Sequence, residues 1–320
     1  DSIDGGGGSD ILVLTATSTS LNDATDDQLV NVEAISATAA TAGAIISLAN
    51  QTTTTEGFSI TGGVGADQLT GGSGKDTFIG FVGDDSIDGG DGADTIVLTA
   101  TSAALNKAVD EQLVNVEAIT AATATAGVII NLANQTTTTE GFSITGGLAA
   151  DTISGGAGDD AIVTGAGNDR IDGFVGADTI DGGDGVDTLV LKATSTTLNN
   201  ATNDQLVNLE AISAAGATAG VIITLASQAT ATEGFSITGG GGADTLTGGS
   251  GADTFIGFAG ADVIDGGGGL DTIVLAATSS ALNNAADGQL TNVEAISAAT
   301  AIAEVIINLT NQTTPTEGFS

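Results

Sequence analysis

Residues 62–97 have the sequence GGVGADQLT-GGSGKDTFI-GFVGDDSID-GGDGADTIV, a run of four nonapeptides without a gap. Each nonapeptide has glycine at its first and fourth positions, aspartate at its sixth and a large apolar residue at its eighth. Glycine accepts positive φ and close backbone approach, so the first six residues can form a tight turn. The last three residues predict a short β-strand whose apolar side chain points into a core.

The tight turns and their aspartates together predict a metal site. A turn of this kind directs backbone carbonyl oxygens inward, and the aspartate adds a carboxylate. Ca²⁺ binds about six to eight hard oxygen ligands at roughly 2.3–2.6 Å, and carbonyl and carboxylate oxygens are ligands of that kind. The predicted Ca²⁺ ligands are the sixth-position aspartates of all such turns in the chain: Asp1, Asp10, Asp67, Asp76, Asp85, Asp94, Asp151, Asp160, Asp169, Asp178, Asp187, Asp244, Asp253, Asp262 and Asp271.

The pattern G-G-x-G-x-D-x-U-x, where U is a large apolar residue, resembles the RTX (haemolysin-type calcium-binding) family, and in particular its large repetitive surface, matrix and S-layer-like members. The resemblance implies an all-β fold, a parallel β-roll or β-solenoid in which two nonapeptides form one coil. Position n then lies above position n+18, with Ca²⁺ between like turns. The implied pairs are Asp67/Asp85, Asp76/Asp94, Asp151/Asp169, Asp160/Asp178, Asp169/Asp187, Asp244/Asp262 and Asp253/Asp271. The resemblance also implies secretion from a Gram-negative bacterium through a type I system.

The nonapeptides are grouped in blocks that alternate with β-rich spacers. Three spacers are each 48 residues long, and a fourth, at the end of the chain, is shorter. The block at 146–190 has five nonapeptides where its neighbours have four, so it should hold one more Ca²⁺. The predicted division is a partial RTX block at 1–13, a spacer at 14–61, a block at 62–97, a spacer at 98–145, a block at 146–190, a spacer at 191–238, a block at 239–274 and a partial spacer at 275–320.

The spacers are rich in Ile, Val, Thr and Phe, which favours strands. In the first spacer and the strand before it, the expected strands are 11–16, 30–37, 44–49 and 58–61, with a helical turn at 22–28. Two architectures are open: the spacers either continue the solenoid as wider coils or fold as separate small β modules. Their constant length and the single glycine in mid-spacer, Gly43, favour continuation, and a module of this size would have a poor core.

Two sets of polar residues recur in the spacers, and each set has two interpretations. Either set could supply accessory Ca²⁺ ligands where the solenoid restarts. Alternatively, they form a solvated face or a hydrogen-bonded ladder of asparagines between coils. The first set is the Asn-x-Glu motif, with Asn31/Glu33, Asn115/Glu117, Asn208/Glu210 and Asn292/Glu294; the second is Glu56, Glu140, Glu233 and Glu317.

The composition excludes several classes of protein. The chain has 40 acidic and 4 basic residues, a formal charge of −36, so it repels itself unless cations bind and is unsuited to nucleic acid. No cysteine is present to form disulfides, and no apolar stretch approaches the length of a membrane span. The chain also lacks His and Tyr, and its carboxylates recur at repeat spacing, whereas an active site is normally unique. We therefore predict no enzyme activity in this segment and no membrane insertion.

The favoured function is a calcium-stabilised extracellular structural protein, part of a bacterial surface layer, filament or biofilm matrix. One alternative is a calcium-triggered folding or secretion domain of a larger RTX toxin or secreted enzyme. Another is an RTX adhesin with a ligand-binding surface. The expected partners are Ca²⁺ ions and further copies of the chain, joined end to end or laterally, because the ends of a solenoid expose unpaired strand edges.

Overall fold

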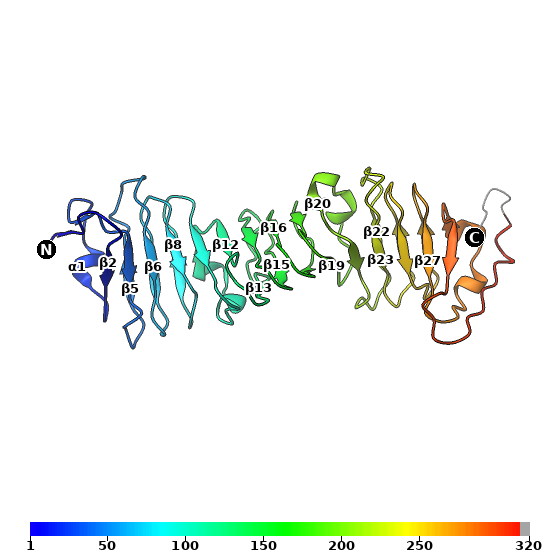
Figure 1. Cartoon of the computed structure of the whole chain (residues 1–320), viewed down its shortest axis with the longest axis horizontal. Helices are drawn as coiled ribbons and strands as arrows, with labels where there is room; N and C mark the ends of the chain where they lie inside the picture. The colour runs from blue at the N-terminus through cyan, green and yellow to red at the C-terminus, as the bar shows by residue number, and fades with distance from the viewer. Residues whose placement is uncertain (314–320) are drawn as a thin grey trace. The chain divides into compact units, whose positions relative to one another are not determined.

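The computed structural model describes residues 1–313. The chain forms two compact units, Asp1–Ala166 and Gly167–Ser320. In each unit, short parallel strands lie side by side and wind into successive coils (Figure 1). The described residues are all-β apart from one helix of four residues and short 3₁₀ helices. The expected all-β parallel β-roll is therefore confirmed.

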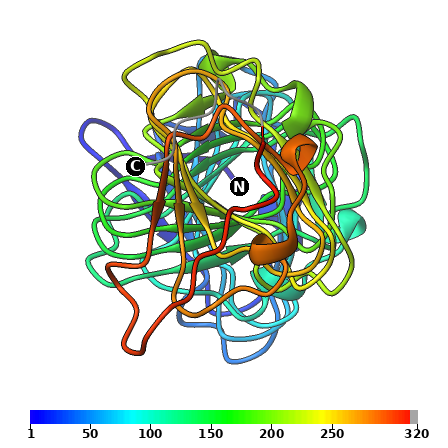
Figure 2. The same cartoon turned by 90° about the vertical axis from the view of Figure 1, so that its right-hand side faces the viewer.

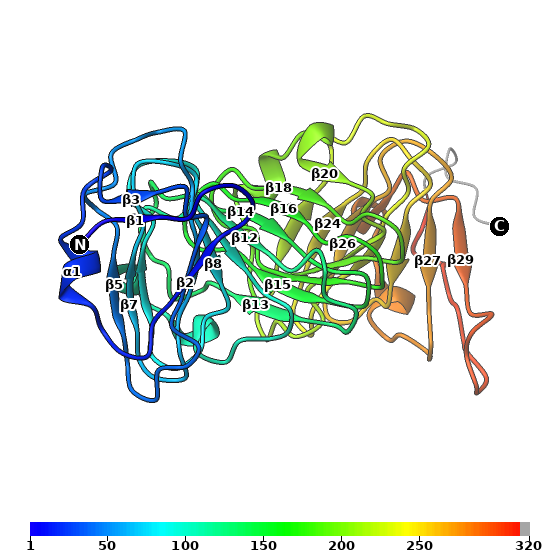
Figure 3. The ribbon, with the colours of Figure 1, turned by 60° about the vertical axis from the view of Figure 1, so that its left-hand side comes forward.

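The first unit contains strands on several walls of the coil. Its elements are β1 (Ile3–Asp4), β2 (Ile11–Val13), α1 (Thr19–Asn22), β3 (Leu29–Val30), β4 (Ala34–Ser36), β5 (Ile45–Ser47), β6 (Ser59–Thr61), β7 (Gln68–Thr70), β8 (Thr77–Ile79), β9 (Ser86–Asp88), β10 (Thr95–Val97), η1 (Leu105–Lys107), η2 (Asp110–Gln112), β11 (Leu113–Val114), β12 (Ala118–Thr120), β13 (Ile129–Asn131), β14 (Ser143–Thr145), β15 (Thr152–Ser154) and β16 (Ala161–Val163). One wall has the order β2-β4-β6-β8-β10-β12-β14-β16, and another has β5-β7-β9-β11. The remaining pairs are β1-β3 and β13-β15 (Figure 3).

The second unit repeats this arrangement. Its elements are β17 (Arg170–Asp172), β18 (Thr179–Asp181), β19 (Thr188–Val190), η3 (Leu198–Asn200), η4 (Asn203–Gln205), β20 (Leu206–Val207), β21 (Ala211–Ser213), β22 (Ile222–Thr224), β23 (Ser236–Thr238), β24 (Thr245–Thr247), β25 (Thr254–Ile256), β26 (Val263–Asp265), β27 (Thr272–Val274), η5 (Leu282–Asn284), η6 (Asp287–Gln289), β28 (Leu290–Thr291) and β29 (Ala295–Ser297). The long wall has the order β17-β19-β21-β23-β25-β27-β29. Opposite strands form β18-β20 and β22-β24-β26-β28.

Strand register within a block follows the predicted interval of two nonapeptides. Thr77 of β8 pairs with Thr95 of β10, and Gln68 of β7 pairs with Ser86 of β9. Two nonapeptides thus complete one coil, and their strands lie on opposite walls. Figure 2 views these coils end-on.

The core is a stack of the apolar residues at the eighth position of each nonapeptide. Phe78, Ile87 and Ile96 are at most 1% exposed, and in the blocks at 146–190 and 239–274 the same position is also buried. Phe81 replaces the second-position glycine of its turn and is 1% exposed. The same replacement at Phe174 and Phe258 is also buried, so an aromatic ring fills the roll at this turn in three blocks.

The spacers continue the roll as wider coils. In the second spacer, Thr95 of β10 pairs with Ala118 of β12, and Ala118 pairs in turn with Ser143 of β14. Both intervals along the chain are longer than the two nonapeptides of a block coil, yet the spacer strands lie in the same wall as the nonapeptide strands. The same pattern joins β19, β21 and β23 in the second unit. Of the two architectures left open by the sequence, each unit has the continuous one.

The strands expected at 11–16, 44–49 and 58–61 are present but shorter, as β2, β5 and β6, and the fourth expected strand is interrupted. The strand expected at 30–37 is divided into β3 and β4, because Asn31 has φ of 52° and turns the chain from one wall to another. Asn115, Asn208 and Asn292 have the same left-handed conformation, which asparagine tolerates better than most residues. Asn-x-Glu is therefore a corner of the coil, and its two polar side chains do not share one face of a strand.

The helical turn expected at 22–28 is divided in two: helix α1 ends at Asn22, and a second turn follows in which the Gln28 N–H donates to the Thr25 carbonyl. Helix α1 starts at Thr19 because Ser18, which accepts a hydrogen bond from the Leu21 N–H, caps its N-terminus. In the later spacers a pair of 3₁₀ helices occupies this region, as η1 and η2 do in the second spacer. The side chain of Gln28 accepts from the backbone N–H of Thr25, and Gln112 accepts in the same way from Val109, so this contact does not need the threonine side chain.

Candidate metal centre

The sixth-position aspartates lie inside the roll. The exposed fraction is 4% or less for Asp67, Asp76, Asp85, Asp94, Asp151, Asp160, Asp169, Asp178, Asp187, Asp244, Asp253, Asp262 and Asp271. Asp10 is half-buried and Asp1 is exposed. Carboxylates are almost never buried without a partner, so these side chains need hydrogen-bond donors or cations.

Aspartates at equivalent positions of successive coils are joined by a repeated hydrogen bond. The backbone N–H of Asp67 donates to Oδ1 of Asp85 at 2.9 Å, and that of Asp76 donates to Oδ1 of Asp94 at 2.7 Å. We call this series of bonds the carboxylate ladder. In the second unit it joins Asp169 to Asp187, Asp244 to Asp262 and Asp253 to Asp271. Asp151/Asp169 and Asp160/Asp178 have one member in each unit and stay predictions.

The second carboxylate oxygen closes the aspartate's own turn in the early part of a block. Oδ2 of Asp67 accepts from the N–H of Gly63 at 2.6 Å, and Oδ2 of Asp76 accepts from Gly72 at 2.7 Å. A carboxylate that accepts several backbone N–H bonds is held rigidly in one orientation. The aspartate therefore shapes the turn in addition to carrying its charge.

Backbone carbonyl oxygens of one turn face the glycines of the turn stacked on it. Gly90 has φ of 94°, and a Cβ there would lie 2.2 Å from the carbonyl oxygen of Gly72. Gly92 has φ of 147°, and its Cβ would lie 2.1 Å from the oxygen of Gly74. No other residue type fits so close an approach. The missing side chains leave a space lined by oxygens between stacked turns.

The last aspartate of the blocks at 62–97 and 239–274 differs from those before it, whose Oδ2 atoms each accept a backbone N–H. Oδ2 of Asp94 is buried and has no hydrogen-bond partner, and the same holds for Oδ2 of Asp187 and of Asp271. The N–H of Gly90, which would match the donor of earlier turns, donates instead to Oδ1 of Asp88 at 3.2 Å. A buried carboxylate oxygen without a donor is costly unless a cation approaches it.

Burial raises the pKa of several aspartates of the carboxylate ladder, most of all at the block ends. The pKa of Asp94 rises to about 7, first because the carboxyl group is desolvated and then because Asp76, Glu117 and Asp88 carry like charge. The same causes raise the pKa of Asp187 and of Asp271 to about 6. Desolvation also raises the pKa of Asp76 and Asp85. A cation beside these carboxylates would oppose this rise in pKa, because it favours their charged form.

The donor set fits Ca²⁺. Carboxylate and carbonyl oxygens are the hard ligands that Ca²⁺ prefers, and the unpartnered oxygens lie where such an ion would relieve them. Between residues 1 and 313, no group of three or more His, Cys, Asp or Glu side chains is arranged to hold a metal by itself. Backbone carbonyls must therefore provide part of any coordination shell, as expected for glycine-rich turns. Ca²⁺ bound there would supply the missing positive charge.

The spacer glutamates behave differently in the two recurring sets. Glu56 and Glu140 are exposed, and Glu233 is half-buried. The carbonyl oxygen of Glu56 lies against Gly74, so this position contributes backbone rather than carboxylate to the turn. Glu317 lies outside the described residues. In the glutamates of Asn-x-Glu, by contrast, the carboxylate itself is engaged. Its Oε2 accepts a hydrogen bond from the backbone N–H of the last aspartate of the preceding block.

Buried glutamines form a third recurring set that the sequence patterns did not bring out. Gln51 is 2% exposed, and its Nε2 donates to the carbonyl of Ala24 at 2.7 Å. Gln135 and Gln228 repeat this contact with Ala108 and Ala201. The sequence contains a signal for this set, because a glutamine follows Asn22 and its equivalents at a constant spacing along the chain.

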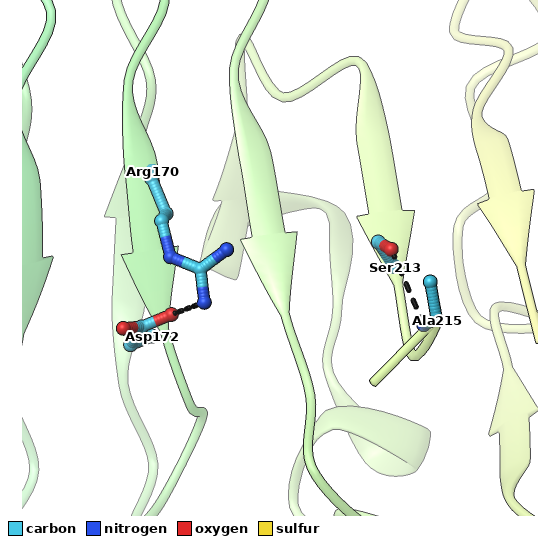
Figure 4. Close-up of polar contacts among 4 residues, drawn as sticks. All are labelled: Arg170, Asp172, Ser213 and Ala215. Atoms are coloured by element: carbon cyan, nitrogen blue, oxygen red, sulfur yellow. Dashed lines mark hydrogen bonds and ion pairs between the residues drawn. The ribbon is translucent and has the colours of Figure 1, made fainter. Parts of the chain in front are cut away.

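The sequence contains a single arginine, and it lies in the second unit. Arg170 forms an ion pair with Asp172 at 2.5 Å on the outside of β17 (Figure 4). A nearby open cleft of about 450 Å³ is lined by Arg170, Thr188 and Ser213 among others. The hydroxyl of Ser213 accepts from the N–H of Ala215, so it is engaged in a local turn. This arrangement does not resemble a nucleophile with a base.

These features define the class of the protein, a parallel β-roll whose stacked glycine–aspartate turns bind calcium. The chain carries RTX repeats. The family model for the RTX calcium-binding nonapeptide repeat (4 copies) matches residues 1–16, 61–96, 143–171, 154–189 and 238–273. No curated protein matches the chain significantly. The RTX resemblance and Ca²⁺ as the bound ion are thus confirmed.

The match to the repeat family also bears on the location and the activity that are typical of such proteins. Proteins with RTX repeats are typically secreted, and the parallel β-roll that they form is typically non-catalytic. Within residues 1–313, the chain has no helix that is long and apolar enough to span a bilayer. The role of each aspartate as a Ca²⁺ ligand stays a prediction.

Proposed function

We propose that this chain is a calcium-stabilised structural element of an extracellular surface layer, filament or matrix of a bacterium. The observation that carries the proposal is the carboxylate ladder, which recurs with the same geometry in the blocks at 62–97, 146–190 and 239–274. Repetition adds length without adding a unique site, which suits a mechanical role. We further propose that a Gram-negative type I system exports the chain.

The proposed ion sites are the spaces between like turns of successive coils, with the fifteen sixth-position aspartates as their carboxylate ligands. Ca²⁺ bound only by the folded state stabilises that state by mass action. The chain would fold where calcium is abundant, outside the cell, and stay unfolded where it is scarce. Its formal charge of −36 would oppose folding until the ions bind.

The test is deletion of one block-and-spacer repeat, positions 178–261, from the gene in the native organism. This deletion joins Ala177 to Asp262 and preserves the nonapeptide register, since Asp262 occupies the position of Asp178. We expect a shorter or weaker surface structure, seen by electron microscopy, with secreted enzyme activities unchanged. Removal of a similar length that breaks the nonapeptide register is the control for misfolding.

The alternative is a calcium-triggered folding domain attached to a secreted toxin or enzyme. It uses the same calcium chemistry and is favoured by the typical secretion of proteins with RTX repeats. The same deletion separates the two roles. Loss of a lytic or enzymatic activity, with surface structures intact, would replace our proposal by this alternative.

A further inference from the structure

The carboxylate ladder does not stop where a block ends. The next coil belongs to a spacer and has no sixth-position aspartate, yet the backbone N–H of Asp94 donates to Oε2 of Glu117 at 2.7 Å. This glutamate takes the place that the aspartate of another nonapeptide coil would fill. The same bond joins Asp10 to Glu33, Asp187 to Glu210 and Asp271 to Glu294, at 2.7, 2.7 and 2.8 Å.

The asparagine of the motif takes the place of a turn glycine. Within a block, the Cβ position of Gly71 lies 2.1 Å from the carbonyl oxygen of Gly89 and 2.3 Å from Oδ2 of Asp76. At the block end, the Cβ position of Gly89 lies 1.9 Å from the carbonyl oxygen of Asn115 and 2.5 Å from Oδ2 of Asp94. The carbonyl of Asn115 therefore stands where the carbonyl of the next first-position glycine would be.

The left-handed backbone of Asn115 makes this substitution possible. Its φ of 50° aims the carbonyl into the turn, and its Nδ2 donates to Oδ1 of Asp88 at 2.8 Å, which fixes the side chain outward. Glutamate is one methylene longer than aspartate, so it reaches the ladder from only two residues after the asparagine. Asn-x-Glu thereby compresses the first and sixth positions of a calcium turn into three residues.

A separate observation is a buried carboxylate oxygen without a hydrogen-bond donor at this junction. Asp94 is 0% exposed, and its Oδ2, which lies near the Cβ position of Gly89 as the carbonyl oxygen of Asn115 does, has no hydrogen-bond partner. Asp187 and Asp271 repeat the feature at 0% and 1% exposure. In the preceding coil the equivalent oxygen of Asp76 accepts an N–H from Gly72. The unpartnered oxygen therefore occurs at the end of each of these blocks, where Asn-x-Glu follows.

We propose that each Asn-x-Glu motif completes an additional Ca²⁺ site at the junction of block and spacer. In the second spacer, its protein ligands are Oδ2 of Asp94, the carbonyl oxygen of Asn115 and the carboxylate of Glu117. The equivalent sites use Asp10/Asn31/Glu33, Asp187/Asn208/Glu210 and Asp271/Asn292/Glu294. These sites join each spacer to the block before it, so the ion-binding column continues into the wider coil. The inference rests on calcium binding by the repeats and is independent of the mechanical role.

The first experiment counts ions on the folded chain by native mass spectrometry in Ca²⁺. Glu117→Gln keeps an acceptor for the Asp94 N–H but removes the charge, so it should bind about one ion fewer than wild type. Glu111→Gln is the matched control, because Glu111 lies in the same spacer, is exposed and carries the same charge. It should leave the count unchanged. An equal count for Glu117→Gln and wild type would overturn the proposal.

Asn115→Gly tests the backbone contribution. Glycine keeps the left-handed conformation and the carbonyl ligand, so this variant should retain the junction ion. Asp67→Asn should lower the count through a site between turns while leaving the junction ion in place, since Asp67 belongs to the other column of the first unit. Loss of the junction ion in Asp67→Asn at full folding would argue against a separate site.

The second experiment locates the ions in the unaltered protein and does not depend on how a variant folds. A crystal of the wild-type chain grown in Ca²⁺ and exchanged with Tb³⁺ should show anomalous peaks between stacked turns and also beside Oδ2 of Asp94, Asp187 and Asp271. Peaks between turns without peaks at the junctions would reject the junction sites and leave the calcium function intact. Absence of peaks at both places would reject both.

Discussion

Asp76 donates its backbone N–H to Oδ1 of Asp94, in the coil that follows, at 2.7 Å, while Oδ2 of Asp76 holds its own turn through Gly72. One side chain type thus links adjacent coils and shapes each turn. Both carboxylates are buried, and the pKa of each is raised by desolvation. The ladder therefore stores like charge in the interior, and Ca²⁺ is the natural counterion.

Calcium removal should unfold the chain. Without ions the stacked carboxylates repel one another, and no cation holds the oxygens of neighbouring turns together. We expect a largely disordered circular dichroism spectrum in excess chelator and a β-rich spectrum in millimolar Ca²⁺. Mg²⁺ at the same concentration is the control, because it demands a smaller octahedral site and gives up its waters reluctantly. A β spectrum that persists unchanged in chelator would reject this prediction.

A ladder aspartate should matter more than its neighbour. Asp85→Asn removes a buried charge from the pair with Asp67, whereas Asp84→Asn removes the same charge from an exposed side chain one residue away. We expect Asp85→Asn to lower the free energy of unfolding in Ca²⁺ by about 1–3 kcal/mol and to weaken one ion site. Asp84→Asn should be nearly neutral. Calorimetric titration with Ca²⁺ measures both, and indistinguishable variants would contradict the assignment.

Substitution of one central aspartate in the block at 146–190 should release more Ca²⁺ than substitution of one aspartate in the block at 62–97. Asp169 belongs to two predicted pairs, with Asp151 and Asp187, whereas Asp67 belongs only to the pair with Asp85. Asp169→Asn should therefore weaken about two sites and Asp67→Asn about one. Equilibrium dialysis at limiting Ca²⁺ gives the two occupancies. Equal losses would show that stacking in coils of two nonapeptides does not continue through the middle block.

Acid should partly replace calcium. The folded-state pKa of Asp94 is raised to about 7 and those of Asp187 and Asp271 to about 6, so the folded calcium-free chain binds more protons than the unfolded chain between these values and about pH 4. Its stability should accordingly rise as pH falls from 7 toward 4. In chelator, the β signal should increase on acidification, and apparent Ca²⁺ affinity should fall. A chelated chain that loses further structure between pH 7 and about pH 5 would contradict this.

Close stacking of turns should make certain glycines irreplaceable. Gly92→Ala places a Cβ 2.1 Å from the carbonyl oxygen of Gly74 and also requires φ of 147°, which alanine rarely adopts. We expect destabilisation of more than about 1 kcal/mol and loss of calcium at this turn. Gly216→Ala is the matched control, since no atom lies within 4 Å of its Cβ position. Thermal unfolding in Ca²⁺ compares the two, and similar midpoints would be evidence against the stacking.

The nonapeptides were predictable because their constraints are local and periodic. Glycine spacing defines the turn, the aspartate recurs in phase, and the eighth position marks the core, so buried Asp85 and Ile87 both follow from the sequence pattern. The register of two nonapeptides per coil came from the family resemblance, and the strand pairs within each unit confirm it. The individual ion sites stay predictions.

The spacers were less predictable because their shape depends on the coils beside them. Strand content was expected, but the corner at Asn31 was not, since a single asparagine between apolar residues gives no local turn signal. The contact of Glu33 with the N–H of Asp10 joins two coils and depends on the width of the spacer coil. Helix α1 lies before most of the expected helical turn because Ser18 provides the hydrogen bond that starts it.

The carboxylate ladder gives the roll a direction. Each coil offers backbone N–H groups toward the coil that follows and carboxylate oxygens toward the coil that precedes, so its two faces are chemically unlike. Two copies joined through such faces can meet only head to tail, because like faces present donor to donor or acceptor to acceptor. Contacts of that kind do not form a two-fold dimer, and they continue into an open filament wherever the rotation between copies does not close a ring. Any filament extended through this ladder would therefore be polar, with one growing end distinct from the other.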